Sequence, residues 1–279
     1  MSKLPEQDEK PGKSEQEPDG MTLWEHLEEL RGRLVKMLIA FAIGGIAAWS
    51  QKERLLGILT TPFVEAWNKG HHSEHAALHF PAPASLFFEY VRLSALSGFV
   101  FALPIMLYQV WAFVAPGLYS REKRYALPFV ASSCLLFAGG GYFGWGVAFP
   151  LAFRFLLGLS DKPVEGLEVK PTVMISDYLD FVMRMLLSFG LAAELPVLVF
   201  FLAVAGIVTH RHLIKFFRYF LVLDFVVAAV VTPPDVTSQL LLAIPLAGLY
   251  IFSIGVAWLF ARKPKPPDPE DPDAPPAAA

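Results

Sequence analysis

The sequence predicts an all-α integral membrane protein with six transmembrane helices and with both termini in the cytoplasm. Of its 279 residues, 54% are hydrophobic and 18% are charged, whereas ordinary soluble domains carry about 25% charged residues. The apolar residues come in runs that approach the length of about 20 residues needed to cross the hydrocarbon core. The cations gather at segment ends and form no basic stripe, so the net charge of -3 gives no indication of a nucleic-acid partner.

The N-terminal residues 1–20 are predicted to be a disordered acidic tail. They hold six acids, three lysines and no apolar run. Such a segment buries too little apolar surface to fold, and it lacks the apolar stretch of a cleavable signal peptide. We expect one membrane domain over residues 21–260.

An amphipathic helix is predicted over residues 22–33. Four leucines recur at helical spacing and share one stripe: Leu23, Leu27, Leu30 and Leu34. Thr22 followed by Glu25 fits a capping box. We expect this helix to lie flat on the membrane surface, with its leucines toward lipid and with Glu29 facing away.

Six apolar runs follow and are predicted to be the membrane spans. They lie near residues 34–50, 85–113, 125–158, 177–205, 216–231 and 238–260. The fifth, at about 16 residues, is short for a crossing that needs about 20. The sixth is interrupted by Pro245 and Gly248.

The cations of the short connectors predict the orientation of these spans. One side holds Arg31, Arg33, Lys36, Arg121, Lys123, Arg124, Arg211, Lys215, Arg218, Arg262, Lys263 and Lys265. The opposite connectors are longer, yet they hold only Lys52, Arg54, Lys69, Lys162 and Lys170. Because cytoplasmic loops carry the excess of cations, both termini are predicted to be cytoplasmic, and Glu29 and Glu122 fall on the same face.

The outer connector, residues 51–84, is predicted to form a cap over the outer ends of the helices, because it contains an apolar segment at 55–67 and several prolines. Its histidines are His71, His72, His75 and His79. Three of them are spaced by four, as zinc ligands can be, but loop residues surround them and no matching carboxylate or cysteine is spaced nearby. We expect neither a metal nor a cofactor. Residues 261–279, rich in proline and aspartate, are predicted to be a disordered tail.

Glu194 is the most conspicuous polar residue inside a span. Leu195 and Pro196 follow it, and because proline removes a helical hydrogen bond, a kink is predicted beside the carboxylate. A carboxylate at this depth faces protein or a water-filled recess. It is either a hydrogen-bonded staple between two helices or a polar contact point for a partner.

Three further polar residues belong to the last two spans. Asp235 follows Thr232-Pro233-Pro234 and is either the N-cap of the sixth helix or, with Gln239, a polar site that lies deep because both spans are short. For Asp224, within the fifth span, the default expectation is a hydrogen bond between helices.

Several charges are spaced as ion pairs within one helix. Glu89 with Arg92 and Asp180 with Arg184 stand three and four residues apart, and we expect structural pairs. Glu29 and Arg33 have the same spacing, so a pair on a solvated face is the alternative to a functional role for Glu29.

No enzyme motif is found, and we do not expect an enzyme. The zinc-protease, nucleophile-elbow, phosphate-loop and dinucleotide-binding patterns are absent from the sequence, and Cys134 is the single cysteine. A proton-coupled small-molecule transporter using Glu194 and Asp224 is one alternative function. An intramembrane hydrolase is another, but no nucleophile with a suitable base is evident.

Five segments together resemble the TatC family, the polytopic core subunit of the twin-arginine protein translocase. They are HLEELRGRL at 26–34, YQVWAFVAPGLYSREKR at 108–124, FPLAF at 149–153, AELP at 193–196 and TPPDVTSQLLLAIP at 232–245. The resemblance covers about residues 21–260 in order and with similar spacing. It implies a concave helical bundle in the inner membrane that binds signal peptides with consecutive arginines on its cytoplasmic face.

The resemblance also implies roles for particular residues. Glu29 and Glu122 match the two carboxylates of the family that receive the arginines, which agrees with the bidentate pairing of carboxylate and guanidinium. The positions that shape this surface are Arg31, Phe113, Pro116 and Tyr119. Glu194 would lie in the concave face, Asp235 and Gln239 match the last motif, and Pro62 matches the outer cap.

The family works with single-span partners of the TatA and TatB type and moves folded proteins with the proton gradient. This implied assembly is consistent with a chain that has no nucleotide-binding motif. Two positions depart from the family pattern, since Lys123-Arg124 replaces two arginines and Trp145 replaces a tyrosine. Neither departure removes a carboxylate.

Overall fold

The computed structural model describes residues 23–69, 75–114, 126–159 and 171–260, and within these ranges the fold is helical. The helices are α1 (Leu23–Ser50), α2 (Lys52–Lys69), α3 (Pro83–Val114), α4 (Ala126–Phe143), η3 (Gly144–Ala148), α5 (Phe149–Gly158), α6 (Ile175–Ala192), α7 (Leu195–Val204), α8 (His210–Val231) and α9 (Val236–Phe260). Among the described residues, the β-type pairing consists of an isolated bridge between His79 and Met174.

Five helical runs in this part of the chain are long and apolar enough to cross a membrane. They are Leu27–Ser50, Pro83–Phe113, Pro128–Gly158, Ile175–Val204 and Val236–Phe260. The helix α8, predicted as the fifth span, is not among them. The all-helical membrane architecture is therefore confirmed, while the fifth predicted span, at α8, stays a prediction.

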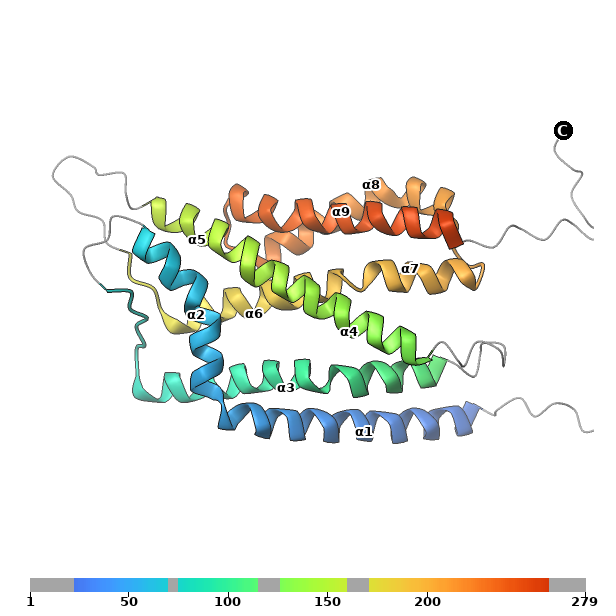
Figure 1. The fold of residues 1–279 in the computed structure, drawn as a ribbon, viewed down its shortest axis with the longest axis horizontal. Helices are drawn as coiled ribbons and strands as arrows, with labels where there is room; N and C mark the ends of the chain where they lie inside the picture. The colour runs from blue at the N-terminus through green and yellow to red at the C-terminus, as the bar shows by residue number, and fades with distance from the viewer. Residues whose placement is uncertain (1–22, 70–74, 115–125, 160–170, 261–279) are drawn as a thin grey trace, which may run out of the picture.

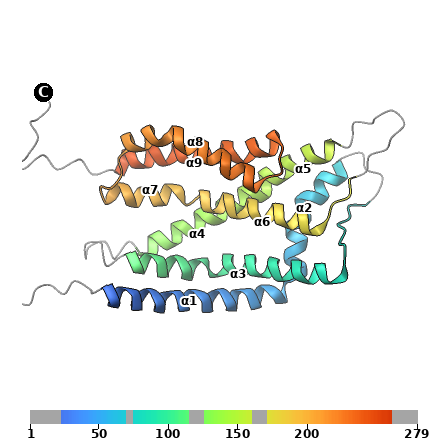
Figure 2. The same ribbon diagram turned by 180° about the vertical axis from the view of Figure 1, so that it is seen from behind.

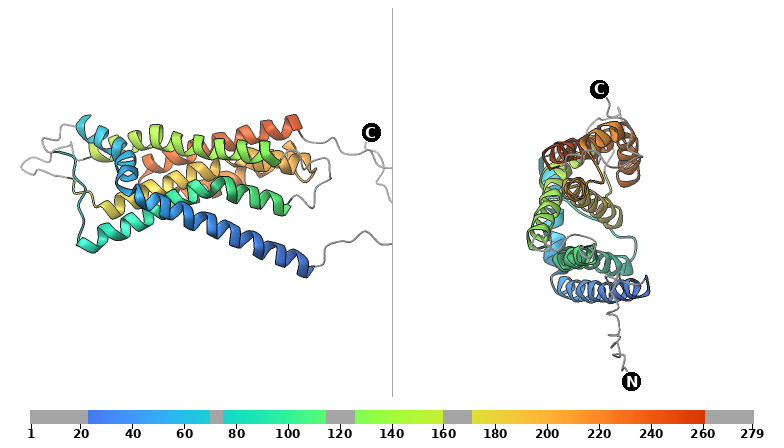
Figure 3. Two further views of the ribbon diagram at one scale, coloured as in Figure 1. Left: turned by 60° about the horizontal axis from the view of Figure 1, so that its bottom comes forward. Right: turned by 90° about the vertical axis from the view of Figure 1, so that its right-hand side faces the viewer.

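The long helices lie roughly side by side in a flattened bundle (Figure 1). The pair α1 and α3 forms one edge and the pair α8 and α9 the other, with α4 to α7 between them, as the end-on view of Figure 3 also shows. The start of α1 and the end of α9 lie at the same end of the bundle (Figures 1 and 2). We call this the terminal end, and the opposite end, where α2 lies, the cap end.

Glycines allow α1 and α3 to pack closely. A Cβ atom placed on Gly44 would lie 2.7 Å from the carbonyl oxygen of Gly98, and one placed on Gly98 would lie 2.6 Å from the Cα of Gly45. In a bilayer, where lipid is as apolar as leucine, such backbone proximity supplies the packing contacts that hold two helices together. These glycines therefore fix the position of α1 on the bundle.

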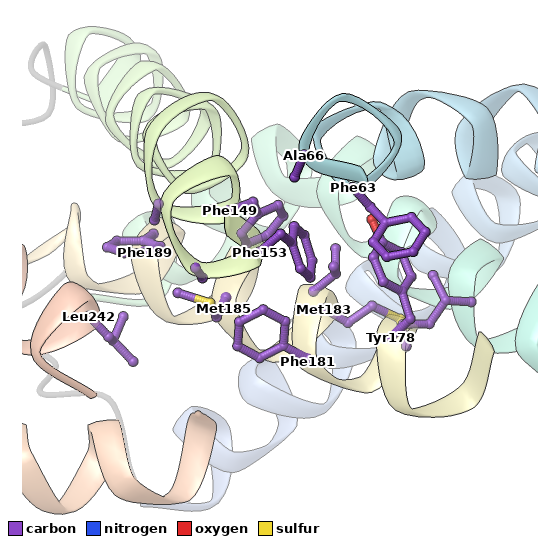
Figure 4. Packing of buried hydrophobic residues seen from close by; sticks show 14 of the residues in the cluster. Phe63, Ala66, Phe149, Phe153, Tyr178, Phe181, Met183, Met185, Phe189 and Leu242 are labelled. Carbon is purple, nitrogen blue, oxygen red and sulfur yellow. The ribbon is translucent and has the colours of Figure 1, made fainter. Parts of the chain in front are cut away.

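Aromatic side chains build the core where α2 meets α5 and α6 (Figure 4). The ring of Tyr178 lies 5.4 Å from those of Phe63 and Phe153, and its hydroxyl donates a hydrogen bond of 2.7 Å to the carbonyl of Leu59. Pro62 is buried inside α2. The predicted packing of segment 55–67 against the membrane helices is thus confirmed.

The N-terminal region differs from the prediction of a separate surface helix over residues 22–33. The amphipathic segment and the first span form one continuous helix from Leu23 to Ser50. No proline separates the leucine stripe from the span. The one glycine there, Gly32, lowers the stability of a helix by only about 1 kcal/mol relative to alanine. Thr22 and the side chain of Glu25, which the predicted capping box needs, lie outside the described part.

The predicted spans near 125–158 and 216–231 need correction in detail. The first contains a π-helical turn at Gly144–Ala148, in which the N–H of Phe149 donates to the carbonyl of Gly144. Pro150 follows directly and cannot donate to the carbonyl four residues back, which accounts for the altered hydrogen bonding. The helix α8 begins already at His210, capped by Thr209, so Arg211, Lys215 and Arg218 lie on a helix and not in a connector.

The sixth predicted span is not interrupted. The helix α9 runs unbroken from Val236 to Phe260 and contains Pro245. A proline inside a helix removes one backbone hydrogen bond, and here the packing of Ala243 and Leu246 in the core holds the helix on both sides of it.

Candidate functional site

Glu29 lies in a small polar cluster near the terminal end of α1 and α3. Its Oε1 atom accepts a hydrogen bond of 3.1 Å from Arg33 Nε and a shorter one from Nη2 of the same guanidinium. Arg33 Nη1 also donates to Oε1 of Gln109 on α3, at 3.5 Å. The Glu29 side chain is 22% exposed, and a guanidinium already binds its carboxylate.

The predicted pair of Glu29 and Arg33 is confirmed, but the link to Gln109 was missed. Gln109 is buried within an apolar helix, and a buried amide requires partners because an unpaired one is costly. A glutamine inside an apolar run therefore predicts a polar partner. The sequence does not identify that partner, because α1 and α3 are far apart along the chain.

The other residues predicted for this surface divide into two groups. Arg31 is exposed on α1, and Phe113 is half-buried in the last turn of α3. Glu122, Pro116 and Tyr119 lie in segment 115–125, outside the described residues. The structure thus brings Glu29, near the start of α1, and Phe113, near the end of α3, to the terminal end.

The predicted kink beside Glu194 is confirmed. The helix α6 ends at Ala192, Glu194 occupies the turn, and α7 begins at Leu195 with Pro196 in its first turn. Oε1 of Glu194 is buried without a hydrogen bond among the described residues, so the staple between two helices stays a prediction. The hydroxyl of Ser133 on α4 is close to the carboxylate, but it has no partner with hydrogen-bonding geometry either.

Asp235 and Gln239 stabilise the junction of α8 and α9. Asp235 Oδ1 accepts a hydrogen bond of 2.7 Å from the backbone N–H of Ser238, which confirms the predicted N-cap. The side-chain amide of Gln239 donates to the carbonyl of Phe225 on α8, at 3.0 Å. Gln239 also lines an open groove of about 450 Å³ with apolar side chains of α8, namely Leu221, Val222, Phe225, Val226 and Ala229.

Asp224 does not make the hydrogen bond between helices that the sequence suggested. It is 3% exposed, and neither of its carboxylate oxygens has a partner in the described part of the chain. One turn further along α8, Ala228 packs in the apolar cluster that contains Leu242 and Ala243 of α9. The carboxyl therefore faces a side of the bundle that offers few polar groups.

A network of ion pairs and hydrogen bonds joins three helices toward the cap end. The predicted pairs Glu89–Arg92 and Asp180–Arg184 are both present. Arg92 of α3 also binds Asp180 of α6, and Arg184 Nη1 donates to the carbonyl of Val230 on α8 at 3.4 Å. Sequence spacing predicted the contacts within each helix, but it gave no signal for the contacts between them.

The described residues contain no group of three metal-ligating side chains. His71 and His72 lie outside the described part, and the backbone of His79 bonds to Val173 and Ile175.

Comparison with known proteins identifies the family. Residues 25–245 match the family model for the Sec-independent protein translocase protein (TatC). The TatC proteins of Desulforapulum autotrophicum and Koribacter versatilis are 40% and 39% identical over 239 and 245 residues; the alignments cover 86% and 88% of this chain and 85% and 88% of those proteins. The crystal structure of a twin-arginine translocase receptor TatC, 37% identical, matches with a TM-score of 0.75 over 85% of this chain and 100% of that chain. This chain therefore belongs to the TatC family of Sec-independent protein translocase proteins.

Proposed function

We propose that this chain is the receptor and assembly core of a twin-arginine translocase, and that it binds twin-arginine signal peptides at the terminal end of its bundle. As a TatC protein with several apolar helices, it is a multi-pass protein of a prokaryotic inner membrane. In the proposed topology residues 21–260 form one membrane domain of six spans with both termini cytoplasmic, flanked by disordered tails at 1–20 and 261–279.

Helix length and charge support this topology. With 22 residues, α8 is about 33 Å long, so with its charged first turns it extends over about the thickness of the hydrocarbon core, about 30 Å. Arg211, Lys215 and Arg218 lie in its first turns, at the terminal end. A cationic face at this end agrees with a cytoplasmic position.

The observation that supports peptide binding best is the guanidinium of Arg33 on Glu29. Two of its N–H groups approach one carboxylate oxygen, so this position is suited to an arginine side chain. In the proposed complex one signal-peptide arginine binds Glu29 in exchange for Arg33, and Glu122 accepts the second. Arg31, Phe113, Pro116 and Tyr119 shape the surrounding surface.

The remaining predicted residues are proposed to act after this contact. The apolar part of the signal peptide lies along the concave face that contains Glu194, while Asp235 and Gln239 present the groove on α8 to a single-span partner of the TatA or TatB type. Pro62 stabilises the cap that closes the outer end. The energy for transport comes from the proton-motive force. The alternative of a small-molecule transporter gains no support from the comparisons.

Peptide binding to the purified protein tests this proposal. A fluorescent signal peptide with Arg-Arg is compared with a Lys-Lys peptide, on wild type and on the variants Glu29→Gln and Glu122→Gln. Hydrogen bonds to charged groups contribute about 1.5–3 kcal/mol, so Glu122→Gln should weaken Arg-Arg binding by about tenfold or more. Glu29→Gln should weaken it by less, because the peptide arginine has to displace Arg33 from that carboxylate. Glu28→Gln, on the exposed neighbour of Glu29, is the matched control and should bind normally. Equal binding of both peptides by all four proteins would refute the receptor function.

A further inference from the structure

A cavity of about 460 Å³ lies between α2, α3, α4 and α6, and the residues that line it are not those proposed to bind the signal peptide or a partner. Its walls are almost entirely apolar, with Leu59 of α2, Leu96 of α3, Phe137 of α4 and Leu186 of α6 among them. At one side Trp145 donates an indole hydrogen bond of 2.9 Å to the carbonyl of Ile58, which joins the α4–α5 run to α2.

The cavity opens sideways into the bilayer. Three of the helical runs that line it are long and apolar enough to cross the membrane. Lining residues at its mouth are exposed, including Val100 and Phe101 of α3 and Tyr142 of α4. Its natural occupant is therefore apolar and comes from the membrane.

The occupant that suits this cavity best is a thin apolar chain, because the cavity lies between side chains of four helices and has exposed apolar residues at its mouth. The acyl tail of a phospholipid is such a chain, and it can enter between the exposed side chains of α3 and α4.

A cation and two aromatic rings stand beside the cavity, at the level expected for lipid headgroups. Lys52 lies one turn before Leu55 on the same side of α2, and Leu55 lines the cavity. Its Nζ atom lies 5.1 Å from the ring centroid of Trp49 and 5.7 Å from that of Tyr90. Tryptophan and tyrosine mark the interface between membrane and water, and a lysine placed there attracts an anionic headgroup.

We propose that this cavity is a binding site for one acyl chain of an anionic phospholipid, whose phosphate binds Lys52. The lipid belongs to the leaflet at the cap end. It fills the space between α3 and α4 and supports α2 from beneath, so it stabilises the aromatic core at that end. The site does not depend on the receptor function proposed above.

Photo-crosslinking tests the acyl-chain site. The full chain is placed in phosphatidylcholine nanodiscs with a small amount of phosphatidylglycerol that carries a photoactivatable acyl chain, and adducts are mapped by mass spectrometry. Ala138→Trp fills the cavity, since Ala138 lines it. Leu135→Trp, on the same helix but 74% exposed and not in the lining, is the control.

We expect adducts to concentrate on the lining of α3 and α4, and Ala138→Trp to reduce them at least fivefold while Leu135→Trp leaves them unchanged. Gly141→Leu provides a second way to fill the site, because a Cβ there meets its nearest neighbour, Leu186, only at 3.9 Å. Adducts spread evenly over all lipid-facing helices, and equal in every variant, would show ordinary surrounding lipid and overturn the proposal.

A second comparison tests the headgroup. Adducts with photoactivatable phosphatidylglycerol should exceed those with photoactivatable phosphatidylcholine, and Lys52→Gln should abolish this preference. Lys69→Gln, at the other end of α2, should keep it. If Lys52→Gln keeps the preference as well, the assignment of the phosphate to Lys52 is wrong.

Discussion

Replacing Gly98 by alanine should separate α1 from α3 and destabilise the protein. The added Cβ would lie 2.6 Å from the Cα of Gly45 and 3.0 Å from the carbonyl carbon of Gly44. Both are backbone atoms, which cannot rotate away as a side chain can, so the helices must move apart. Overpacking of a dense interior costs about 1–3 kcal/mol, and a backbone clash belongs at the upper end of that range.

Thermal unfolding in detergent, followed by circular dichroism, measures this cost. Gly255→Ala on α9 is the matched control, because a Cβ there meets nothing within 4 Å and alanine is the better helix former by about 1 kcal/mol. We expect Gly98→Ala to unfold at a clearly lower temperature than wild type and Gly255→Ala at the same or a slightly higher one. If both variants unfold like wild type, close packing of α1 on α3 is not what holds that edge together.

Three smaller changes test other parts of the fold by the same measurement. Arg92→Leu leaves the buried carboxylate of Glu89 without its cation and should cost about 1–2 kcal/mol, less than a fully buried pair because the Arg92 side chain is 46% exposed, whereas Arg92→Lys should retain part of that stability. Asp235→Ala removes the N-cap of α9 and should cost about 1 kcal/mol, with Asp235→Asn close to wild type. Tyr178→Phe removes the hydrogen bond to Leu59 but keeps the ring packing, so it should cost about 1 kcal/mol; no loss would mean that the ring alone holds α2.

Features that depend on one helix were predictable from the sequence. Hydropathy located the five apolar runs, and the proline after Glu194 predicted the break between α6 and α7. Spacings of three and four residues predicted the pairs of Glu89 with Arg92 and of Asp180 with Arg184. Each of these rests on local geometry, which is the same in every helix.

Features that depend on how helices meet were not predictable from one sequence. The contact of Arg92 with Asp180 and the close approach of Gly44 to Gly98 both require the relative placement of distant segments. The continuity of α1 was missed for another reason. An amphipathic stripe followed by a span is compatible with two helices or one, and only tertiary packing decides between them.

The pairing of Glu29 with Arg33 has a consequence for the strength of peptide binding under the proposed function. A signal-peptide arginine exchanges one guanidinium for another on the same carboxylate, so the net gain at Glu29 is smaller than that of a new ion pair. Most of the binding free energy must then come from the second arginine and from burial of the apolar segment. Arg33→Gln removes the competitor and should tighten binding of the Arg-Arg peptide, whereas unchanged or weaker binding would indicate that Arg33 positions the carboxylate and does not compete for it.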